Sequence, residues 1–214
     1  MRGFSSYSTN PRTSVKVIGL TGRLGAGKGE VASILETLGA TILNADVEAH
    51  QLYKKDSPAW LKMIKLFGRN ILTGNGEIDR AKLAQIVFSE GAALKQLNEL
   101  MHPLIRERIT HRLSALEQGG TQTVILEAPL LLEAGWTDLV NEVWLVTAPK
   151  TQIFERLKKQ RNLSRLQIEQ RFKAQRSEKW KATFASTVIE NDGSYDALTS
   201  LVTRIWNQWI EERN

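Results

Sequence analysis

Short apolar runs alternate with helical patterns along the chain and set its framework. Five such runs, bounded by turn residues or helical patterns, lie at residues 15–20, 41–44, 123–127, 143–147 and 187–190. Each is nearly continuous in apolar residues, which is typical of strands covered on both faces. The alternation predicts the α/β class, with a doubly wound, five-stranded parallel sheet that binds its ligands at the carboxyl ends of the strands.

The stretch between the second and third runs carries helical punctuation but no strand pattern. Ser57, followed by proline, predicts the start of one helix, and Gly68 predicts its end. Asp79 is placed to cap a second helix, and Pro103 predicts the first turn of a third. This stretch is too long for a simple crossover. We therefore expect residues 51–120 to form a helical insertion that could cover a second substrate.

Helical patterns also flank the last apolar run. A helix around residues 151–159 is followed by a short polar turn, and Ser164 is placed to cap a basic helix that runs through Gln175. Two helices joined in this way can hinge. A final helix, at residues 195–211, carries an apolar packing stripe. The core of a single domain is then expected from residues 15–50, 121–150 and 183–214.

A glycine-rich loop joins the first apolar run to the helix that follows. The loop runs from Gly22 to Lys28, and apolar positions at helical spacing then continue as far as Gly39. Glycines let the backbone turn tightly, so that amide N–H groups and a helix N-terminus face an anion. Lys28 adds a point charge for the outer phosphates. Strand, loop and helix together predict a phosphate-binding loop.

The residues after Lys28 depart from the usual loop pattern. Gly29 and Glu30 occupy places where most such loops carry Ser or Thr. In many of these loops that hydroxyl ligates magnesium, so its absence weakens any prediction of a direct protein ligand from this position. The loop nevertheless resembles that of adenylate kinases, in which glycine also follows the lysine, and the departure does not exclude catalysis.

Composition limits the remaining possibilities. The chain has 214 residues, of which 42% are hydrophobic, enough for one substantial core. No apolar stretch reaches the ~18 residues that a membrane span needs, so no membrane partner is expected. The absence of cysteine excludes disulfides, zinc–thiolate sites and thiol nucleophiles. Residues 1–14 contain no acidic residue and several serines, and we expect a flexible leader rather than a transit segment.

The positive charge of the chain is concentrated in one segment. The net charge is +6, yet residues 150–181 alone hold eleven basic residues against three acidic ones. Nucleic-acid binders usually combine basic stripes with stacking aromatic side chains or a reading helix, and neither is evident in this sequence. A compact basic segment that faces a phosphate loop favours a small polyphosphate ligand, and no nucleic-acid partner is expected.

Two acidic residues follow strand ends and are candidates for chemistry. Asp46 comes just after the second run, where a carboxylate could orient an attacking hydroxyl and accept its proton. The alternative is that Asp46 only caps a helix that begins at Val47. Glu127 ends the third run and could bind hydrated magnesium or a substrate amide, or simply be exposed. His50 and His102 are weaker candidates, because a lone helical histidine more often packs or is solvated.

The ordered set of motifs resembles the dephospho-coenzyme A kinase family. The resemblance runs from about Val15 to the final helix, and the His-Pro-Leu-Ile and Pro-Leu-Leu segments make it specific. It rests on residues 19–28, 43–46, 102–105, 129–133 and 191–193, with His50, Gln152, Arg156 and Gln175. It implies a phosphate-loop kinase fold with a core, a helical coenzyme-binding insertion at about 51–120, and a basic, mobile lid at about 151–182.

The resemblance also implies a reaction and its partners. The γ-phosphoryl group of ATP would pass to the ribose 3′-hydroxyl of dephospho-coenzyme A, the last step of coenzyme A synthesis. ATP and Mg²⁺ would be required, and the location would be cytoplasmic. Asn44 stands where an aspartate is frequent in the family, and Gln160-Arg161 replaces the Arg-Asp of its lid.

Matching positions assign roles to individual residues. Asp46 would be the base, and Arg156 and the neighbouring lid cations Arg161 and Arg171 would stabilise the charge on the transferring group. The expected acceptor-binding residues are Asp46, His50, His102 and Glu127. The expected ATP phosphate site comprises Gly22, Gly25, Ala26, Gly27, Lys28, Gly29 and Glu30.

Two other readings stay open at the level of sequence. The Gly-Lys-Gly run is compatible with a nucleoside monophosphate kinase, whose acceptor would be adenylate, cytidylate or thymidylate. The missing hydroxyl after Lys28 and the amide of Asn44 are compatible with a non-catalytic module that binds nucleotide without transferring phosphate.

Overall fold

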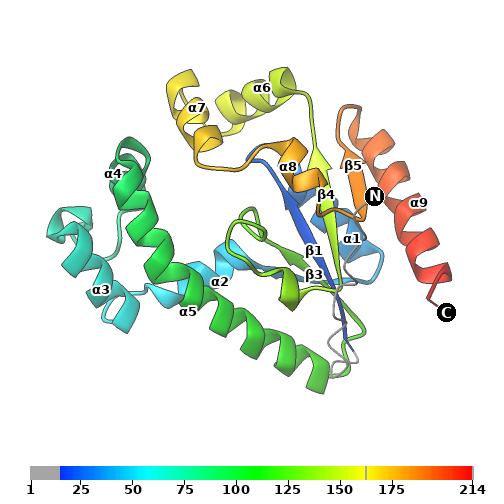
Figure 1. Ribbon diagram of the computed structural model, residues 1–214, viewed down its shortest axis with the longest axis horizontal. Coiled ribbons are helices and arrows are strands. Elements are labelled where there is room, and N and C mark those ends of the chain that lie inside the picture. Colours follow the sequence, from blue (N-terminus) through cyan, green and yellow to red (C-terminus); the bar gives the residue numbers. More distant parts are fainter. Residues whose placement is uncertain (1–14, 162, 214) are drawn as a thin grey trace, which may run out of the picture.

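A five-stranded, all-parallel sheet forms the centre of the molecule (Figure 1). The computed structural model describes residues 15–161 and 163–213, except for the side chain of Arg161. The strands lie in the order β2-β3-β1-β4-β5. Their bounds are β1 Lys16–Gly22, β2 Thr41–Asn44, β3 Thr123–Glu127, β4 Glu142–Thr147 and β5 Thr187–Glu190. The predicted doubly wound, five-stranded parallel sheet is confirmed.

Helices cover both faces of this sheet. Their bounds are α1 Lys28–Thr37, α2 Ala45–Leu52, α3 Pro58–Phe67, α4 Arg80–Ser89, α5 Gly91–Gln118, α6 Lys150–Arg161, α7 Arg165–Lys173, α8 Glu178–Ala182 and α9 Tyr195–Glu211. Single 3₁₀ turns lie at Arg69–Ile71 and Thr137–Leu139. None of the helices in the described part of the chain is long and apolar enough to cross a membrane.

Side chains alternate along each strand and supply two hydrophobic cores. On β1, Val17 packs with residues of α3, α4 and α5, whereas Ile18 and Leu20 pack with residues of α1 and α9. On β3, Val124 and Ile125 divide between the two cores in the same way. The near-continuous apolar pattern of the strands follows from this two-sided burial.

Helix starts follow the predicted capping residues. The side chains of Ser57, Asp79 and Ser164 accept hydrogen bonds from the first turns of α3, α4 and α7. Ser164 and Gln167 form a complete capping box, so the basic helix α7 begins at the expected place. The short helix α8, capped by Ser177, was not expected from the pattern.

Two predicted boundaries were wrong. β1 extends two residues beyond the apolar run, because Thr21 and Gly22 still pair with Leu145 and Val146 of β4. Pro103 does not begin a helix but lies inside α5. Proline removes one intrahelical hydrogen bond, but the buried stripe of Met101, Ile105, Ile109 and Leu113 runs through this position and continues the helix.

Segments between the strands bring the functional elements to one end of the sheet. Along the chain, α2 to α5 connect β2 to β3, and α6 to α8 connect β4 to β5 (Figure 1). α7 packs against α4, so the basic helices bridge towards the helices at residues 58–118. The domain boundaries expected from the sequence stay a prediction. The expected leader at residues 1–14 lies outside the described residues.

Candidate active site

The glycine-rich loop lies between β1 and α1, at the carboxyl end of the central strand. Gly27 is the N-cap of α1 with a φ of 96°, and no side chain caps the helix. The first N–H groups of α1 are therefore left for an anion. A Cβ atom at Gly27 would lie 2.0 Å from Nδ2 of Asn191, and one at Gly25, where φ is 80°, would lie 2.8 Å from Ile153. Both positions require glycine, because α6 and Asn191 approach the loop closely.

Lys28 is buried at the base of this loop. Its Nζ atom donates hydrogen bonds to the carbonyl oxygens of Gly22 and Arg23, both at 3.1 Å. The ammonium group therefore braces the loop from inside. Burial raises the pKa of the Glu127 carboxyl group, and the positive charge of Lys28 partly offsets this rise. Lys28 thus lies between the phosphate loop and the acidic side chain at the end of β3.

Asn191 joins the phosphate loop to α6. Its side chain is buried, and Nδ2 donates to the carbonyl oxygen of Ala26 at 3.0 Å and to Oε2 of Glu30 at 3.1 Å. Its Oδ1 atom and its carbonyl oxygen accept from Nη2 of Arg156. Arg156 is therefore held beside the loop, as expected for a residue that contacts phosphate.

One nitrogen of Arg156 remains available. Nη1 is buried, and it finds no hydrogen-bond partner among the described residues. Nη2, in contrast, also donates to Oε1 of Gln152, and Nε2 of Gln152 donates to the carbonyl oxygen of Asp192. A buried guanidinium N–H without an acceptor suits an anionic oxygen. The unpartnered N–H group of Arg156 therefore fits a bound polyphosphate.

Asp46, Glu127 and Asn44 meet where β2 and β3 end. Nδ2 of Asn44 donates to Oε2 of Glu127 at 2.7 Å, and Oδ1 of Asn44 accepts from the N–H of Val47. Asn44 is therefore the N-cap of α2, and the interpretation of Asp46 as a capping residue was wrong. Asp46 lies in the first turn of α2 with an exposed side chain, free to meet a substrate.

The electrostatics of Glu127 reveal how close these groups lie. Burial raises the pKa of Glu127 above its ordinary value, and the charge of Asp46 raises it further. Lys28 and the hydrogen bond from Asn44 act in the opposite direction. The sequence-predicted residues Lys28, Asp46 and Glu127 are therefore brought together at one end of the sheet.

His50 lies one turn after Asp46 on α2. Burial and the positive charge of Arg80 lower its pKa, and Asp46 opposes this shift. Its ring packs edge-on against Tyr53, with 5.6 Å between the ring centroids. His50 is thus close enough to Asp46 to share its electrostatic field, and it belongs to the same side of the site.

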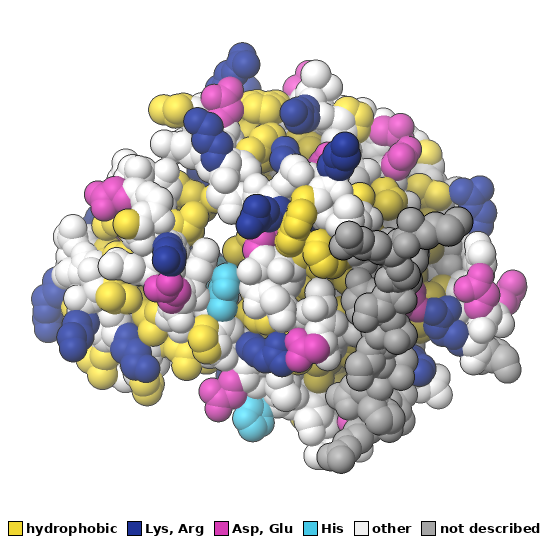
Figure 2. Space-filling model, in the orientation of Figure 1, with side chains coloured by type: hydrophobic (Ala, Val, Ile, Leu, Met, Phe, Trp, Pro, Cys, Tyr) yellow, Lys and Arg dark blue, Asp and Glu magenta, His cyan; other side chains and the backbone are white. Residues whose placement is uncertain are grey.

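His102 occupies a separate place, on α5. Its ring contacts Trp136 edge-on at 5.8 Å, and burial lowers its pKa while Glu133 raises it. His102, Pro103 and Glu133 line a hollow together with the first turns of α5. Figure 2 shows that the surface is hollowed between the helices that follow β2 and the core, with basic, acidic and histidine side chains at the rim.

Of the two lid arginines expected from the sequence, the structure describes the side chain of Arg171 but not that of Arg161. The guanidinium carbon of Arg171 lies 4.7 Å from the ring centroid of Phe88, so α7 contacts α4 through a cation–π pair. Arg171 therefore faces the helices of residues 58–118 rather than the phosphate loop. Arg161 ends α6, and its side chain lies outside the described residues.

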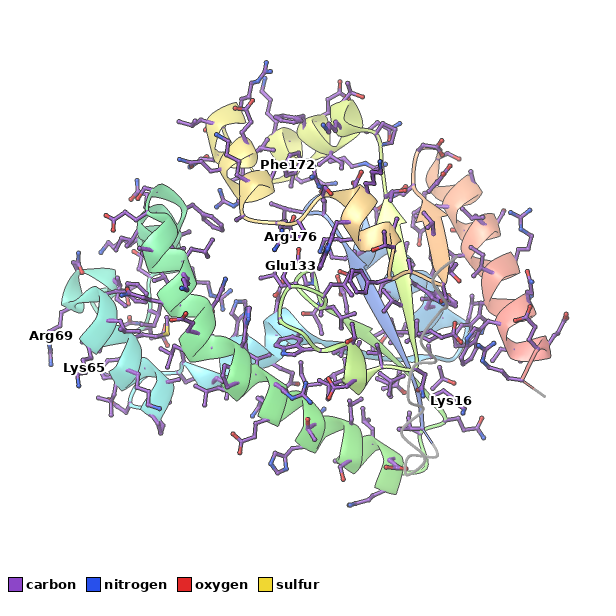
Figure 3. All side chains as sticks on the ribbon, in the orientation of Figure 1. Lys16, Lys65, Arg69, Glu133, Phe172 and Arg176 are labelled. Carbon is purple, nitrogen blue, oxygen red and sulfur yellow. The ribbon has the colours of Figure 1, made fainter. Side chains whose placement is uncertain are left out.

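A buried ion pair that was not predicted lies beside the lid. Lys181 is fully buried on α8, and its Nζ donates to Glu133 and to the carbonyl oxygen of Pro129. Glu133 also accepts from the backbone N–H of Arg176 at 3.1 Å. Figure 3 shows Phe172, Arg176 and Glu133 close together between α7 and the loop that follows β3. From the sequence, Glu133 and Asn191 could be recognised only as members of family motifs. Their contacts could not be predicted, because their partners lie far along the chain.

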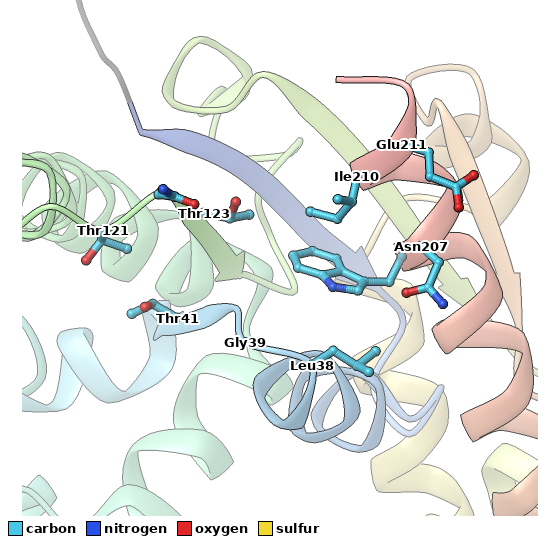
Figure 4. Close-up of a pocket in the computed structure, with 10 residues that line it drawn as sticks. Leu38, Gly39, Thr41, Thr121, Thr123, Asn207, Ile210 and Glu211 are labelled. Atoms are coloured by element: carbon cyan, nitrogen blue, oxygen red, sulfur yellow. The ribbon is translucent and has the colours of Figure 1, made fainter. Parts of the chain in front are cut away.

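A hollow at the opposite end of the sheet is not part of this site (Figure 4). It is lined by Gly39, by Thr41 and Thr123 at the starts of β2 and β3, and by Trp206 of α9. Ligands of doubly wound sheets bind at the carboxyl ends of the strands. The convergence of Lys28, Asp46 and Glu127 therefore marks the functional end.

The described side chains do not form a metal site by themselves. In residues 15–161 and 163–213, no group of three or more histidine, aspartate or glutamate side chains is arranged to hold a metal ion. Two carboxylates, those of Asp46 and Glu127, are close enough to influence one another, and Lys28 acts on Glu127 as well. Such a pair suits a hydrated cation carried by phosphate oxygens better than a metal site built from protein alone.

Comparisons with known proteins agree with this geometry. A family model described as dephospho-CoA kinase matches residues 16–197. The dephospho-CoA kinase of Dehalococcoides mccartyi is 38% identical over 92% of this chain and 99% of its own length.

Solved structures extend the agreement to the fold. The crystal structure of TT1252 from Thermus thermophilus has a TM-score of 0.74 and 32% identity, over 91% of this chain and 97% of that one. Dephospho-CoA kinase from Campylobacter jejuni has a TM-score of 0.58 at 23% identity, over 91% and 97%, and shares the fold. The family match covers most of the residues that form the sheet, the loop and the basic helices. The chain belongs to the dephospho-CoA kinase family.

Proposed function

We propose that this chain transfers the γ-phosphoryl group of ATP to the ribose 3′-hydroxyl of dephospho-CoA, producing CoA and ADP. The observation that carries the proposal is the convergence of Lys28, Asp46 and Glu127 beside a phosphate loop. Phosphoryl transfer depends mainly on positioning and charge stabilisation, and this arrangement supplies an anion site next to a carboxylate. As the last step of coenzyme A synthesis, the reaction also supports a cytoplasmic location.

ATP would bind through its phosphates to the loop at Gly22–Glu30. The uncapped N-terminus of α1 offers N–H groups to the phosphate oxygens, and Lys28 supplies a positive charge. The unpartnered Nη1 of Arg156 would contact the transferring group, where negative charge spreads over the equatorial oxygens. Arg161 and Arg171 remain predicted lid contributors.

Asp46 would accept the proton of the ribose hydroxyl. Its carboxylate is exposed in the first turn of α2, so it can reach an oxygen that enters from solvent. The Asn44 cap fixes this turn against Glu127 and keeps Asp46 near the loop. His50 and Glu127 flank Asp46 and would orient the ribose.

Mg²⁺ is expected to accompany ATP. The carboxylates of Glu127 and Asp46 would hold water molecules of the hydrated ion, because Gly29 offers no hydroxyl at the usual position. When bound, the ion would neutralise charge on the β- and γ-phosphates. The carboxylate of Glu30 accepts a hydrogen bond from Asn191. This bond holds the negative charge of Glu30 on the side of Asn191, away from the phosphate site.

The acceptor would lie between the core and the helices that follow β2. His102 lines a hollow on α5, and the basic helix α7 closes against α4 above it. This arrangement supports the helical insertion at residues 51–120 as the coenzyme-binding part and residues 151–182 as the lid. No nucleic-acid partner is required by it.

Turnover with a panel of acceptors tests the proposal. Purified protein with ATP, Mg²⁺ and dephospho-CoA should produce ADP and CoA in equal amounts, and ADP formation should nearly stop without the acceptor. Adenylate, cytidylate and thymidylate serve as comparison acceptors. Faster transfer to one of these would assign a nucleoside monophosphate kinase, and tight ATP binding with no transfer would assign a binding module.

A further inference from the structure

Arg23 is an arginine of the phosphate loop that the proposed ATP site leaves unused. Its carbonyl oxygen accepts from Lys28, but its side chain extends to the lid, where the guanidinium carbon lies 5.1 Å from the ring centroid of Phe172. The neighbouring N–H of Leu24 donates to Oε1 of Gln175. The loop therefore contacts the end of α7 and the residues just after it at two points, one of which is Arg23.

The guanidinium of Arg23 is only partly satisfied. Its Nε atom is buried and has no hydrogen-bond partner among the residues that the structure describes. Buried N–H groups nearly always have an acceptor, so an unpartnered one on the phosphate loop indicates a ligand. Stacking on Phe172 orients the planar group without consuming its hydrogen-bond donors.

Other cations gather around Arg23. Burial is the main cause that lowers the pKa of Lys181, Glu133 opposes it, and the positive charge of Arg23 adds a smaller lowering effect. Lys181 shares the carbonyl oxygen of Pro129 with the hydroxyl of Thr21, so the cluster adjoins the end of β1. The Arg176 side chain is exposed and lies over Trp180, with 5.5 Å from guanidinium carbon to ring centroid.

The carboxylate at this cluster, Glu133, is already occupied. Its oxygens accept from Nζ of Lys181 and from the backbone N–H of Arg176. Glu133 therefore compensates Lys181 and leaves the guanidinium groups of Arg23 and Arg176 for a ligand. Guanidinium groups bind phosphate oxygens well, and Arg23 and Arg176 supply two of them beside α7, over Phe172 and Trp180.

We propose that Arg23, together with Arg176, binds the diphosphate of the acceptor. The inference rests on the proposed function, because dephospho-CoA carries a diphosphate between its ribose and its pantetheine arm. The ATP phosphates have the amides of the loop, Lys28 and Arg156, whereas the side chain of Arg23 extends from the loop to Phe172 of α7. Arg23 would thus distinguish an acceptor with a diphosphate from a simple nucleoside.

Steady-state kinetics with each substrate varied separately test this assignment. Arg23→Gln should raise the KM for dephospho-CoA about tenfold, since a hydrogen-bonded charge pair is lost, and should change the KM for ATP less than twofold. Arg23→Lys, which keeps the charge, should recover part of the loss. An unchanged KM for dephospho-CoA, or a rise confined to the KM for ATP, would overturn the proposal.

Matched variants separate this effect from other causes. Arg165→Gln removes an exposed lid arginine that pairs with Glu169, and it should leave both KM values unchanged. Arg176→Gln keeps the backbone bond to Glu133 and should also raise the KM for dephospho-CoA; it carries the test if Arg23→Gln does not fold. Absence of turnover in the parent chain would refute the proposed function, whereas turnover with no effect of Arg23→Gln refutes only this inference.

Discussion

Asn191 donates a hydrogen bond from its side-chain amide to the carbonyl oxygen of Ala26, at 3.0 Å, and so fastens the loop after β5 to the phosphate loop. The same amide group contacts Glu30, and its oxygen accepts from Arg156. A single buried residue therefore sets the distance between the phosphate loop and a lid arginine. A charge-stabilising arginine is effective only when it is held in place before the reaction.

Replacement of Asn191 should weaken ATP binding. Asn191→Leu keeps the side-chain size but removes the side-chain bonds to Ala26, Glu30 and Arg156, so we expect a KM for ATP about tenfold higher and a loss of about 2 kcal/mol in stability. ATP titrations and urea unfolding measure the two effects. Asn207→Leu, at an exposed position of α9, is the matched control. A loss of stability with an unaltered KM for ATP would leave Asn191 with a structural role only.

Replacement of Asp46 should affect chemistry rather than nucleotide binding. Asp46→Asn removes the proton acceptor but keeps the shape of the first turn of α2, so kcat should fall by about 10² or more. The KM for ATP should stay close to that of the parent chain, because the phosphate loop is untouched. Val47→Ala, at the exposed neighbouring position, should retain full kcat. A kcat close to the parent value in Asp46→Asn would remove this residue from proton transfer.

The elements that sequence could predict are those fixed by local chemistry. The apolar runs, the glycine loop and the caps Ser57, Asp79 and Ser164 depend on residues that are neighbours along the chain. The position of Asp46 at the end of β2 also followed, because parallel strands place their carboxyl ends together. The identity of the residue that caps α2 did not follow, since Asn44 and Asp46 are equally suited to cap and only the backbone decides between them.

The elements that sequence could not predict depend on distant partners. Pro103 reads locally as a helix start, but burial of Met101 and Ile105 on either side continues α5 through it. Asn191, Glu133 and Lys181 act through residues far along the chain, and no local spacing signals those contacts. One indication of such contacts was present in the sequence. A glutamate and a lysine near apolar runs must find partners if they are buried.

The raised pKa of Glu127 predicts a pH-dependent stability. Burial is the main cause, so the folded chain holds this proton to higher pH than the unfolded chain does. The contribution to stability is present below the ordinary pKa, about 4.3, and is lost as pH rises through the raised value. Glu127→Gln does not titrate and can still accept from Asn44. Urea unfolding should therefore show the parent chain losing stability relative to Glu127→Gln as the pH rises above the ordinary glutamate pKa of about 4.3.

A second variant tests the cause of this shift. The charge of Asp46 contributes to the raised pKa of Glu127, so in an Asp46→Asn background the relative loss should move to lower pH. A stability difference that does not vary with pH, or a parent chain that gains stability as pH rises, would contradict burial of the Glu127 carboxylate.

Removing one partner of the buried pair of Glu133 and Lys181 should lower stability strongly, whereas replacing both partners should lower it little. Glu133→Gln leaves the fully buried ammonium of Lys181 without a charged partner, and we expect a loss of about 3 kcal/mol in guanidinium unfolding. The double variant Glu133→Gln with Lys181→Met removes both charges and should recover most of that loss, because the penalty comes from the uncompensated charge. Glu169→Gln breaks the exposed Arg165 pair and should cost less than about 0.5 kcal/mol. If the double variant is no more stable than Glu133→Gln, the pair contributes through its hydrogen bonds to Pro129 and Arg176 rather than through charge compensation.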